Sequence, residues 1–398
     1  MPKIMSVNAG SSSLKFQLFQ MPEETALTSG VCERIGQEMG TFTIKIDGEK
    51  HSKSVEIKNH KEAVHLLFDA LIEYKVVANL NEIDAVGHRV LHGGEVYSDS
   101  AIFSEKVIAE MVELTELGPL HMPANITGYE AFKEALPNVE HVAVYDTAFH
   151  QTMPKDIFLY PIPYEYYEKY KVRRYGFHGT SHKYVSYRCA ELMNKNVEDL
   201  NIITCHLGNG ASLCAVKGGK SVNTSMGFTP LAGIMMGTRS GDIDPAIIPF
   251  IMSKENISAA ETINVLNNKS GFLGVSGISS DARNIEEGVK QGNERAILTR
   301  KMYANRLAQT IGSYFIQLGH VDAIVFTAGL GENDASVRAE ALDLIKEAMR
   351  VVYDSELNAN TRGEEVKIST PDSSMDVWIV PTNEELVIAQ DVMRLLEL

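Results

Sequence analysis

The chain has few cysteines and no paired cysteine motif. Only four cysteines occur in 398 residues, at positions 32, 189, 205 and 214, and none forms a C-x-x-C spacing. Zinc sites and redox-active dithiols usually require such spacings, so neither is indicated. We expect four reduced thiols, most of them packed as small apolar side chains.

Long apolar runs are also missing. The run IIPFIM at residues 247–252 has six residues and contains a proline, whereas a membrane-spanning helix needs about 20. The first ten residues, MPKIMSVNAG, contain one lysine and no apolar core of a signal peptide. We therefore expect a cytoplasmic protein that does not associate with membranes.

Positive charge is scarce. The sequence has 37 Lys and Arg against 52 Asp and Glu, a formal net charge of -15. This balance argues against nucleic acid or an anionic membrane as a partner, because both attract basic surfaces. Apolar residues still make up 44% of the chain, and its length suggests two or three folded domains. An anionic ligand would have to be bound by positive charge gathered at a few positions.

Strand-like runs alternate with helical patterns along the chain. Strands are expected at residues 4–8, from 14, and at 41–46, 54–57, 83–87, 201–206, 213–216, 323–326 and 377–380. Helices are expected at residues 60–76, from 245, at 295–318, from 336, and after a cap at Thr382 or Asn383. This order predicts an α/β protein. A polar, glycine-containing turn between two strands occurs near residue 9 and again near 209, which suggests a duplicated architecture.

Four glycine-rich turns follow strands: NAGSSS, HLGNGAS, GTRSGD and TAGLGEN. Each alone is compatible with an ordinary turn, but together they predict an anion site built from backbone amides and hydroxyls. A P-loop is disfavoured, since Cys214 stands where the first glycine of a Walker motif ending in Lys220 and Ser221 would be. No turn continues as G-x-G-x-x-G, which disfavours a dinucleotide fold.

Three cationic side chains are candidates for that site. Ser11, Ser13 and Lys15 share one face by the two-residue period of a strand, although a lysine there is also typical of a solvated edge. Arg89 and Arg239 are flanked by glycines, at a position suited to bidentate binding of a carboxylate or a phosphate.

Other candidates have structural alternatives. His178 is a candidate donor to a phosphoryl group, while its i, i+4 spacing with His182 also allows a metal pair. Asp146 ends a strand, where α/β proteins collect catalytic groups, but it is also suited to capping a helix. Glu384 is compatible with a Mg²⁺ ligand or with a first-turn glutamate that favours the helix dipole.

Eight motifs, VNAGSSSLKF, GHRVLHGG, YDTAFHQTMP, YGFHGTSHKYV, HLGNGAS, GTRSGDIDP, FTAGLGEN and PTNEEL, occur in the order seen in acetate kinases. They run from residue 7 to 386, so the chain resembles that family over nearly its whole length. The resemblance implies two duplicated ribonuclease-H-like domains of the actin-like ATPase superfamily, with a nucleotide cleft between them. The implied N-terminal domain covers residues 1–150 plus about 385–398. The implied nucleotide-binding and dimerisation domain covers residues 151–384.

The resemblance also implies roles for individual residues. Asp146, His178 and Arg239 match the positions of the catalytic residues of the acetate kinase family. Asn8 and Glu384 match the positions of its metal ligands. The acetate site would comprise Arg89, Leu91, Leu120, Phe177 and Pro230. The nucleotide site would comprise Ser11, Ser13, Lys15, His206, Leu207, Gly208, Asn209, Gly210, Asp281, Ala282, Arg283, Gly329, Leu330, Gly331, Glu332 and Asn333.

The implied reaction is reversible phosphoryl transfer from ATP to acetate, giving acetyl phosphate and ADP, with Mg²⁺ as cofactor and Mn²⁺ as a substitute. The family also implies a homodimer. An ionised carboxylate needs no general base, so we interpret Asp146 as orienting the Mg²⁺ shell or Arg89. A propionate kinase shares the same motifs. A non-catalytic ATP-binding module on the same fold is an alternative of a different class.

Overall fold

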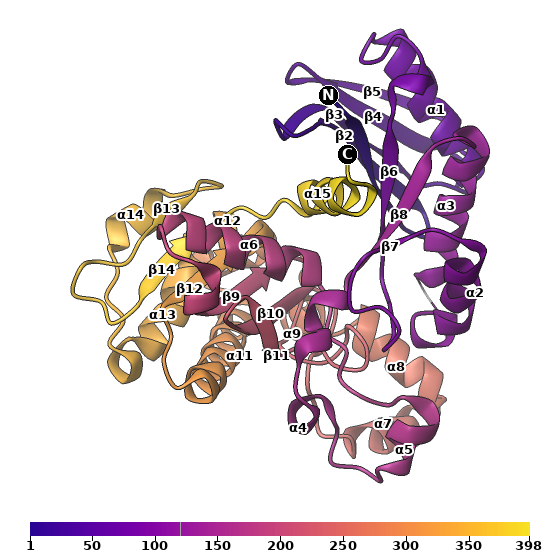
Figure 1. Cartoon of the computed structure of the whole chain (residues 1–398). Coiled ribbons are helices and arrows are strands. Elements are labelled where there is room, and N and C mark those ends of the chain that lie inside the picture. The colour runs from indigo at the N-terminus through magenta and orange to yellow at the C-terminus, as the bar shows by residue number, and fades with distance from the viewer. Residues whose placement is uncertain (120) are drawn as a thin grey trace. The chain divides into compact units, whose positions relative to one another are not determined.

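The computed structural model describes residues 1–119 and 121–398, which divide into two compact units (Figure 1). Unit 1 comprises Met1–Phe149 and Asn383–Leu398, and unit 2 comprises His150–Thr382. Within the described residues, we find no helix that combines the length and the apolar character needed to cross a membrane.

Unit 1 is built on an eight-stranded sheet in the order β5-β4-β3-β2-β1-β6-β8-β7. Its strands are β1 (Lys3–Ala9), β2 (Ser13–Gln20), β3 (Thr25–Glu33), β4 (Gly40–Ile46), β5 (Glu49–Val55), β6 (Ala85–Val90), β7 (Ala101–Ile102) and β8 (Glu140–Tyr145). Strands β1 to β5 form an antiparallel meander. Strands β1, β6 and β8 run parallel, so their carboxyl ends share one edge of the sheet.

Helices cover both faces of this sheet. They are α1 (His60–Glu73), α2 (Glu105–Glu113), α3 (Met122–Ala135) and α15 (Glu384–Leu396). Met5 and Val7 face the apolar core that α1 and α3 complete, while the Ser6 hydroxyl between them donates to the Glu385 carbonyl at 2.6 Å. Figure 1 accordingly shows α15 on the face opposite α1 and α3.

Gly87 brings α15 close to the sheet. A Cβ at this position would lie 2.3 Å from Cγ2 of Ile388, so any larger residue would push the helix away from β6. Asn383 caps the helix by accepting from the Leu386 N–H at 3.1 Å. The close packing and the cap together fix the position of Glu384, the first residue of α15.

Unit 2 contains a six-stranded sheet in the order β11-β10-β9-β12-β14-β13. Its strands are β9 (Asn201–Leu207), β10 (Ala211–Lys217), β11 (Lys220–Thr224), β12 (Ala323–Thr327), β13 (Val366–Lys367) and β14 (Asp376–Ile379). Strands β9, β10 and β11 are antiparallel, whereas β9, β12 and β14 run parallel. A three-stranded meander followed by two parallel strands also occurs in unit 1, so the predicted duplication is confirmed.

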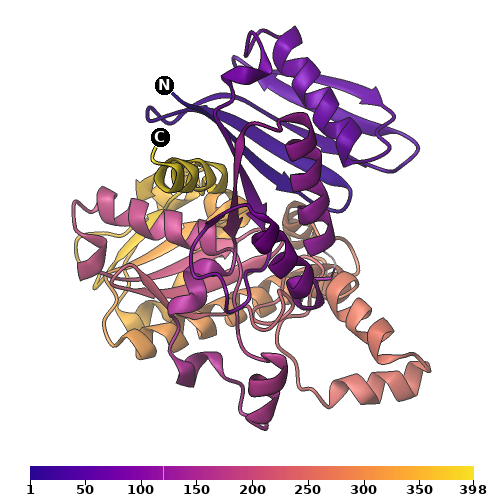
Figure 2. The same ribbon diagram turned by 45° about the vertical axis from the view of Figure 1, so that its right-hand side comes forward.

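The helices of unit 2 surround this sheet and extend from it. They are α4 (Lys155–Phe158), α5 (Glu165–Tyr170), α6 (Gly179–Leu192), α7 (Ile247–Glu255), α8 (Ala259–Asn268), α9 (Gly271–Ser276), α10 (Ala282–Lys290), α11 (Glu294–Leu318), α12 (Ala328–Asn333), α13 (Ala335–Met349) and α14 (Ser355–Asn360). Figure 2 shows α7 and α8 as a helix pair at the margin of the unit. No residue of α7 is buried, despite its apolar sequence.

Most expected elements are present, with a few differences. The strand predicted at residues 54–57 has the wrong bounds, because β5 spans Glu49–Val55 and its polar run offers little apolar alternation to detect. Helix α1 ends at Glu73, three residues early. The strand β3 was not predicted from the sequence. All four cysteines are buried and unpaired, as expected, and burial raises the pKa of Cys32, Cys189 and Cys214 to about 12.

Candidate functional site

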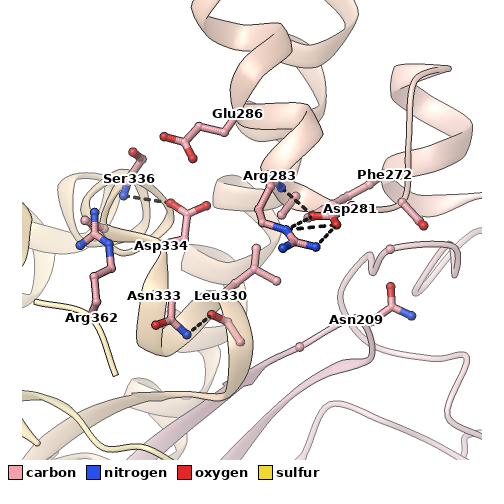
Figure 3. A pocket seen from close by; sticks show the side chains of 16 residues that line it. Asn209, Phe272, Asp281, Arg283, Glu286, Leu330, Asn333, Asp334, Ser336 and Arg362 are labelled. Carbon is pink, nitrogen blue, oxygen red and sulfur yellow. Dashed lines mark hydrogen bonds and ion pairs between the residues drawn. The ribbon is translucent and has the colours of Figure 1, made fainter. Parts of the chain in front are cut away.

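Unit 2 holds a pocket of about 700 Å³ at the carboxyl ends of β9 and β12 (Figure 3). The lining comes from the segments that follow these strands, from α9 and α10, and from residues 237, 280 and 362 of other loops. It consists of Gly208, Asn209, Gly237, Phe272, Ser280, Asp281, Ala282, Arg283, Glu286, Gly329, Leu330, Asn333, Asp334, Ala335, Ser336 and Arg362. Its volume is in the range of small-molecule sites.

The pocket brings together three of the loops expected from the sequence. These contribute Gly208, Asn209, Asp281, Ala282, Arg283, Gly329, Leu330 and Asn333. His206, Leu207, Gly210, Gly331 and Glu332 lie in the same loops but are not part of its lining. The remaining lining residues were not predicted from the sequence. Two of them had a signal nearby, because Gly237 is the first residue of GTRSGDIDP and Asp334 directly follows FTAGLGEN.

The Glu332 side chain does not line the pocket but accepts hydrogen bonds from the backbone next to it. Its Oε1 accepts from the backbone N–H groups of Ala328 at 2.7 Å and Thr382 at 3.0 Å. Ala328 adopts a left-handed backbone conformation with φ of 62°, which is unusual for a residue with a Cβ. The carboxylate of Glu332 therefore stabilises a strained turn beside the pocket.

Gly329 offers a direct test of the pocket. A Cβ there would meet no atom within 4 Å, so a side chain would extend into open space rather than disturb the fold. If this pocket holds the nucleotide that the sequence motifs imply, Gly329→Ile should raise the KM for that nucleotide about tenfold or more, because its branched side chain occupies ligand volume. Steady-state kinetics checks this, with Gly329→Ala as the matched control. An unchanged KM for the nucleotide in both variants would place it elsewhere.

A second glycine contact joins the pocket to the rest of the site. A Cβ on Gly237 would lie 2.1 Å from Oδ1 of Asn209, and the Gly237 N–H donates to the Asn209 carbonyl at 3.1 Å. The GTRSGD turn is thereby packed on the HLGNGAS turn. Arg239 follows two residues later, so the contact also positions its guanidinium group.

Arg239 and His178 meet beside Gly210. A Cβ on Gly210 would lie 3.3 Å from Nη1 of Arg239 and 3.6 Å from Nε2 of His178. Arg239 is half-buried, and burial lowers its pKa. Among the described residues its guanidinium has no carboxylate partner, and it donates to the Pro230 carbonyl at 3.3 Å. An unpaired cation in this setting is favourable when an anion binds next to it.

His178 directly precedes α6 and has a left-handed backbone conformation with φ of 58°. Its Nδ1 lies 2.9 Å from the Ser212 hydroxyl. The alternative of a His178–His182 metal pair is wrong, because both ring nitrogens of His182 are hydrogen-bonded, to Thr204 at 2.7 Å and to Ser212 at 2.8 Å.

Unit 1 carries a separate charged cluster, which we call the Arg89 cluster: Asn8, Lys15, Arg89, Asp146 and Glu384. Asn8 and Lys15 face each other across β1 and β2. Arg89 donates through Nε and Nη2 to the two oxygens of Asp146 at 2.8 and 2.6 Å. Asp146 is buried and pairs with Arg89, so its alternative as a helix cap is wrong.

The pKa values of the Arg89 cluster reflect burial and neighbouring charge. Burial alone would lower the pKa of Arg89, but Asp146, with smaller effects of Glu384 and Glu385, raises it overall. Burial raises the pKa of Glu384 to about 7, with Asp146 and Glu385 adding to the rise while Arg89 and Lys15 oppose it. Glu384 thus ionises only near neutral pH when no cation is bound.

This shift predicts a pH-dependent stability. The folded state holds the Glu384 proton up to about pH 7, whereas the ordinary value is 4.5. Stability is therefore lost as the pH rises from 4.5 to 7, by at most about 3 kcal/mol. We expect Glu384→Gln to lack this loss. Urea unfolding between pH 5 and 8 in the presence of a chelator measures the difference. Parallel profiles for the two proteins would contradict the shift, and Glu397→Gln, at an exposed position, is the control.

The Arg89 cluster fits a divalent cation bound to a nucleotide. Such a Mg²⁺ ion needs only one or two protein carboxylates, with phosphates and water supplying the other oxygens. Asn8 and Glu384 supply an amide and a carboxylate, and the raised pKa of Glu384 shows a carboxylate that a cation would stabilise. Among the described residues, no group of three or more His, Cys, Asp and Glu side chains could hold a metal ion by itself.

The remaining expected residues are less closely grouped. Ser11 is exposed and Ser13 half-buried at the start of β2, and the Gly10 N–H donates to the Ser13 carbonyl at 2.8 Å. Leu91 belongs to unit 1, whereas Phe177 and Pro230 belong to unit 2. Leu120 lies outside the described residues. The methyl pocket that these four would form stays a prediction.

Asn125 is a positioning residue that sequence reasoning missed. From α3, its Oδ1 accepts from the Leu91 N–H at 3.0 Å, and its Nδ2 donates to the Ala9 carbonyl at 2.8 Å. It therefore ties the carboxyl ends of β1 and β6, which carry Asn8 and Arg89. No sequence motif distinguishes it, because asparagine is common on helices.

Comparison with known proteins agrees with this fold. The crystal structure of Porphyromonas gingivalis acetate kinase superposes with a TM-score of 0.95 at 44% identity, covering 100% of both chains. A propionate kinase from Francisella tularensis superposes with a TM-score of 0.93 at 39% identity, covering 98% of this chain and 99% of the other. The fold is thus that of the acetate and propionate kinases.

The sequence comparisons are more specific. An acetate kinase from Geobacillus kaustophilus is 58% identical over 398 residues, covering 100% of both chains. The family model described as the acetokinase family matches residues 3–390. The chain belongs to the acetokinase family.

Proposed function

We propose that the protein transfers the γ-phosphoryl group of ATP reversibly to acetate, giving ADP and acetyl phosphate. The observation that carries this proposal is the half-buried Arg239, a cation without a carboxylate partner among the described residues, beside a glycine turn that continues into the nucleotide-sized pocket. Family membership over the whole chain supplies the reaction class.

In this proposal Arg89 binds the acetate carboxylate. Asp146 occupies one edge of the guanidinium through Nε and Nη2, and among the described residues Nη1 makes no hydrogen bond. Nη1 and the second hydrogen of Nη2 are then available to a carboxylate, which guanidinium binds bidentately. Asp146 orients Arg89 instead of accepting a proton, because acetate is already ionised at neutral pH.

The nucleotide would bind with its base and ribose in the pocket of unit 2. Its lining has two cations, Arg283 and Arg362, against the carboxylates of Asp281, Glu286 and Asp334. This balance disfavours a triphosphate there but suits ribose hydroxyls, which donate to carboxylates. The phosphates would lie along Gly208–Gly210, next to Arg239 and His178, where developing charge on the phosphoryl oxygens is stabilised.

Asn8 and Glu384 would hold the Mg²⁺ of the nucleotide, with Mn²⁺ as a substitute, and the bound ion would neutralise phosphate charge. Lys15, with Ser11 and Ser13 before it, would contact the phosphates from the start of β2. The reaction is one of the cytoplasm, where ATP is available.

The acid substrate distinguishes two candidates. Acetate is the first candidate substrate. Propionate is the second, because a solved propionate kinase is 39% identical to this chain. One methylene changes binding by only about 1–3 kcal/mol, so the two acids differ in efficiency rather than in mechanism.

Trapping the acyl phosphate with hydroxylamine tests the proposal. Purified protein with ATP and Mg²⁺ would be supplied with acetate, propionate or butyrate, and the hydroxamate measured. We expect the highest kcat/KM with acetate. A higher value with propionate would select the second candidate, and no hydroxamate from any acid would leave a non-catalytic ATP-binding module.

We also propose that α7 mediates homodimer formation. Phe250 is 63% exposed and Ile247 is 40% exposed, and a second copy of the chain would bury this apolar surface. Light scattering should give twice the mass of 43.9 kDa, and Phe250→Glu should return it to the monomer value. Val112→Glu, an exposed apolar position in α2, is the control. A monomeric wild-type protein would contradict the proposal.

A further inference from the structure

Two chains of buried and part-buried hydrogen bonds lead to Nδ1 of His178 and to Nδ1 of His206. The first runs from Nδ1 of His178 to the Ser212 hydroxyl at 2.9 Å and on to Nε2 of His182 at 2.8 Å. It continues from Nδ1 of His182 to the Thr204 hydroxyl at 2.7 Å. Ser212, His182 and Thr204 are fully buried, so this part of the hydrogen-bond chain is shielded from solvent.

The Thr204 hydroxyl sets the direction of this chain. Its single proton can go to Nδ1 of His182 at 2.7 Å or to the Cys214 carbonyl at 3.5 Å, a marginal distance. Donation to His182 is the better bond. Burial, with smaller effects of His150 and His206, lowers the pKa of His182 well below its ordinary value, so this ring is neutral and carries its proton on Nε2.

The rest of the chain follows from that proton. Nε2 of His182 donates to the Ser212 hydroxyl, which then donates its own proton to Nδ1 of His178. A histidine that accepts at Nδ1 carries its proton on Nε2. That atom lies on the side of His178 that faces Gly210.

A second chain imposes the same arrangement on His206. The Thr382 hydroxyl donates to the Ser181 hydroxyl at 2.8 Å, and Ser181 lies 2.7 Å from Nδ1 of His206. Ser181 is fully buried, and among the described residues His206 is the one other hydrogen-bond partner of its hydroxyl. The Ser181 proton therefore goes to Nδ1. Nε2 of His206 lies on the Gly208 side, 3.6 Å from where a Cβ of that glycine would be.

The two imidazoles form one structural feature. Their rings stack with centroids 4.1 Å apart and an interplanar angle of 22°. Two imidazolium ions at this separation would repel each other, with the cation Arg239 also beside Gly210. Neutral rings avoid this repulsion and still present N–H groups.

The structure assigns His178 and His206 the neutral tautomer protonated on Nε2, which makes them paired uncharged donors toward the Gly208–Gly210 turn. Ser212, His182, Thr204, Ser181 and Thr382 are then positioning residues that maintain this tautomer. The inference deepens the proposed function and rests on it for the identity of the bound anion, a nucleotide phosphate. It explains how an acidic chain stabilises phosphate with few cations.

Nuclear magnetic resonance tests the tautomers without requiring activity. The full chain would be labelled with ¹⁵N-histidine, and the two rings assigned by the signals lost in His178→Gln and His206→Gln. Long-range ¹H–¹⁵N correlation near neutral pH should show a protonated Nε2 and a bare Nδ1 for both. A proton on Nδ1 of either ring would overturn the inference, whatever the outcome of the hydroxamate assay.

Ser212→Ala tests the positioning role. Loss of the hydrogen bond that orients a metal-ligating histidine typically costs about 10- to 100-fold in activity, and we use the same range for His178. We expect that loss in kcat, with KM for ATP and acetate within threefold and the correlation spectrum of His178 changed. Ser186→Ala, at another fully buried serine, which lies within α6, should stay within twofold of wild type. A Ser212→Ala variant with wild-type kcat and an unchanged His178 spectrum would overturn the role of this chain.

Ser181→Ala tests the hydrogen-bond chain that leads to His206, independently of the chain that leads to His178. It removes the partner of His206 and leaves the Ser212 chain intact, so the spectrum of His206 should change while that of His178 remains. Binding of ADP measured by calorimetry separates a folding defect from a positioning effect. If Ser181→Ala left the His206 spectrum unchanged, the second chain would not set its tautomer.

Discussion

Replacing Arg239 by alanine should lower kcat by about 10³-fold or more, while the KM values for ATP and acetate change less than tenfold. Within the part of the chain that the structure describes, this guanidinium has no carboxylate partner and lies beside the Gly208–Gly210 turn. A positively charged clamp on a transferring phosphoryl group acts mainly on the transition state, and such a loss corresponds to about 4 kcal/mol. Steady-state kinetics in both reaction directions measures the loss.

Three controls make the Arg239 result interpretable. Arg239→Lys keeps the charge but not the planar pair of donors, and should fall between wild type and alanine. Added guanidinium should restore part of the activity of Arg239→Ala. Arg306→Ala, at an exposed position of α11, should retain wild-type kcat. A loss below tenfold in Arg239→Ala would remove this residue from the phosphoryl site.

Replacing Asp146 by asparagine should lower kcat/KM for acetate by roughly 100-fold, the size of effect that a misplaced substrate produces. Asparagine fills nearly the same volume, but it cannot accept from both Nε and Nη2 of Arg89 as the carboxylate does at 2.8 and 2.6 Å. The Arg89 guanidinium then loses its fixed plane. The KM for ATP should change little.

A double-mutant cycle with Arg89→Ala decides how Asp146 acts. If Asp146 works through Arg89, adding Asp146→Asn to Arg89→Ala should reduce kcat/KM by less than threefold further. If Asp146 instead orients the Mg²⁺ shell, the loss should persist in the double mutant and diminish at high Mg²⁺ concentration. Wild-type activity of Asp146→Asn at all Mg²⁺ concentrations would contradict both roles.

The sequence was informative about local structure and about the phosphate-binding turns. Apolar alternation located most strands of both sheets, and the glycine-rich motifs identified loops that line the pocket of unit 2. The strand β5 lies at the edge of its sheet and is mostly polar, and β3, although it lies between β2 and β4, has a mixed burial pattern. Neither strand shows the apolar alternation that such reasoning detects. The lining residues Phe272, Glu286 and Arg362 were also missed, since helices and loops distant in sequence bring them to the pocket.

The sequence by itself determined the α/β class, the duplicated hairpins and the acidic balance that leaves few cations for an anionic ligand. Alternation and glycine turns are local features, and composition is a sum over the chain. Tertiary structure alone decided that Asp146 pairs with Arg89 instead of capping a helix, and that His182 bonds two hydroxyls instead of a metal. It also placed Glu384 among other charges that shift its pKa. Burial and hydrogen-bond direction depend on groups far apart in the chain, which only the folded molecule brings together.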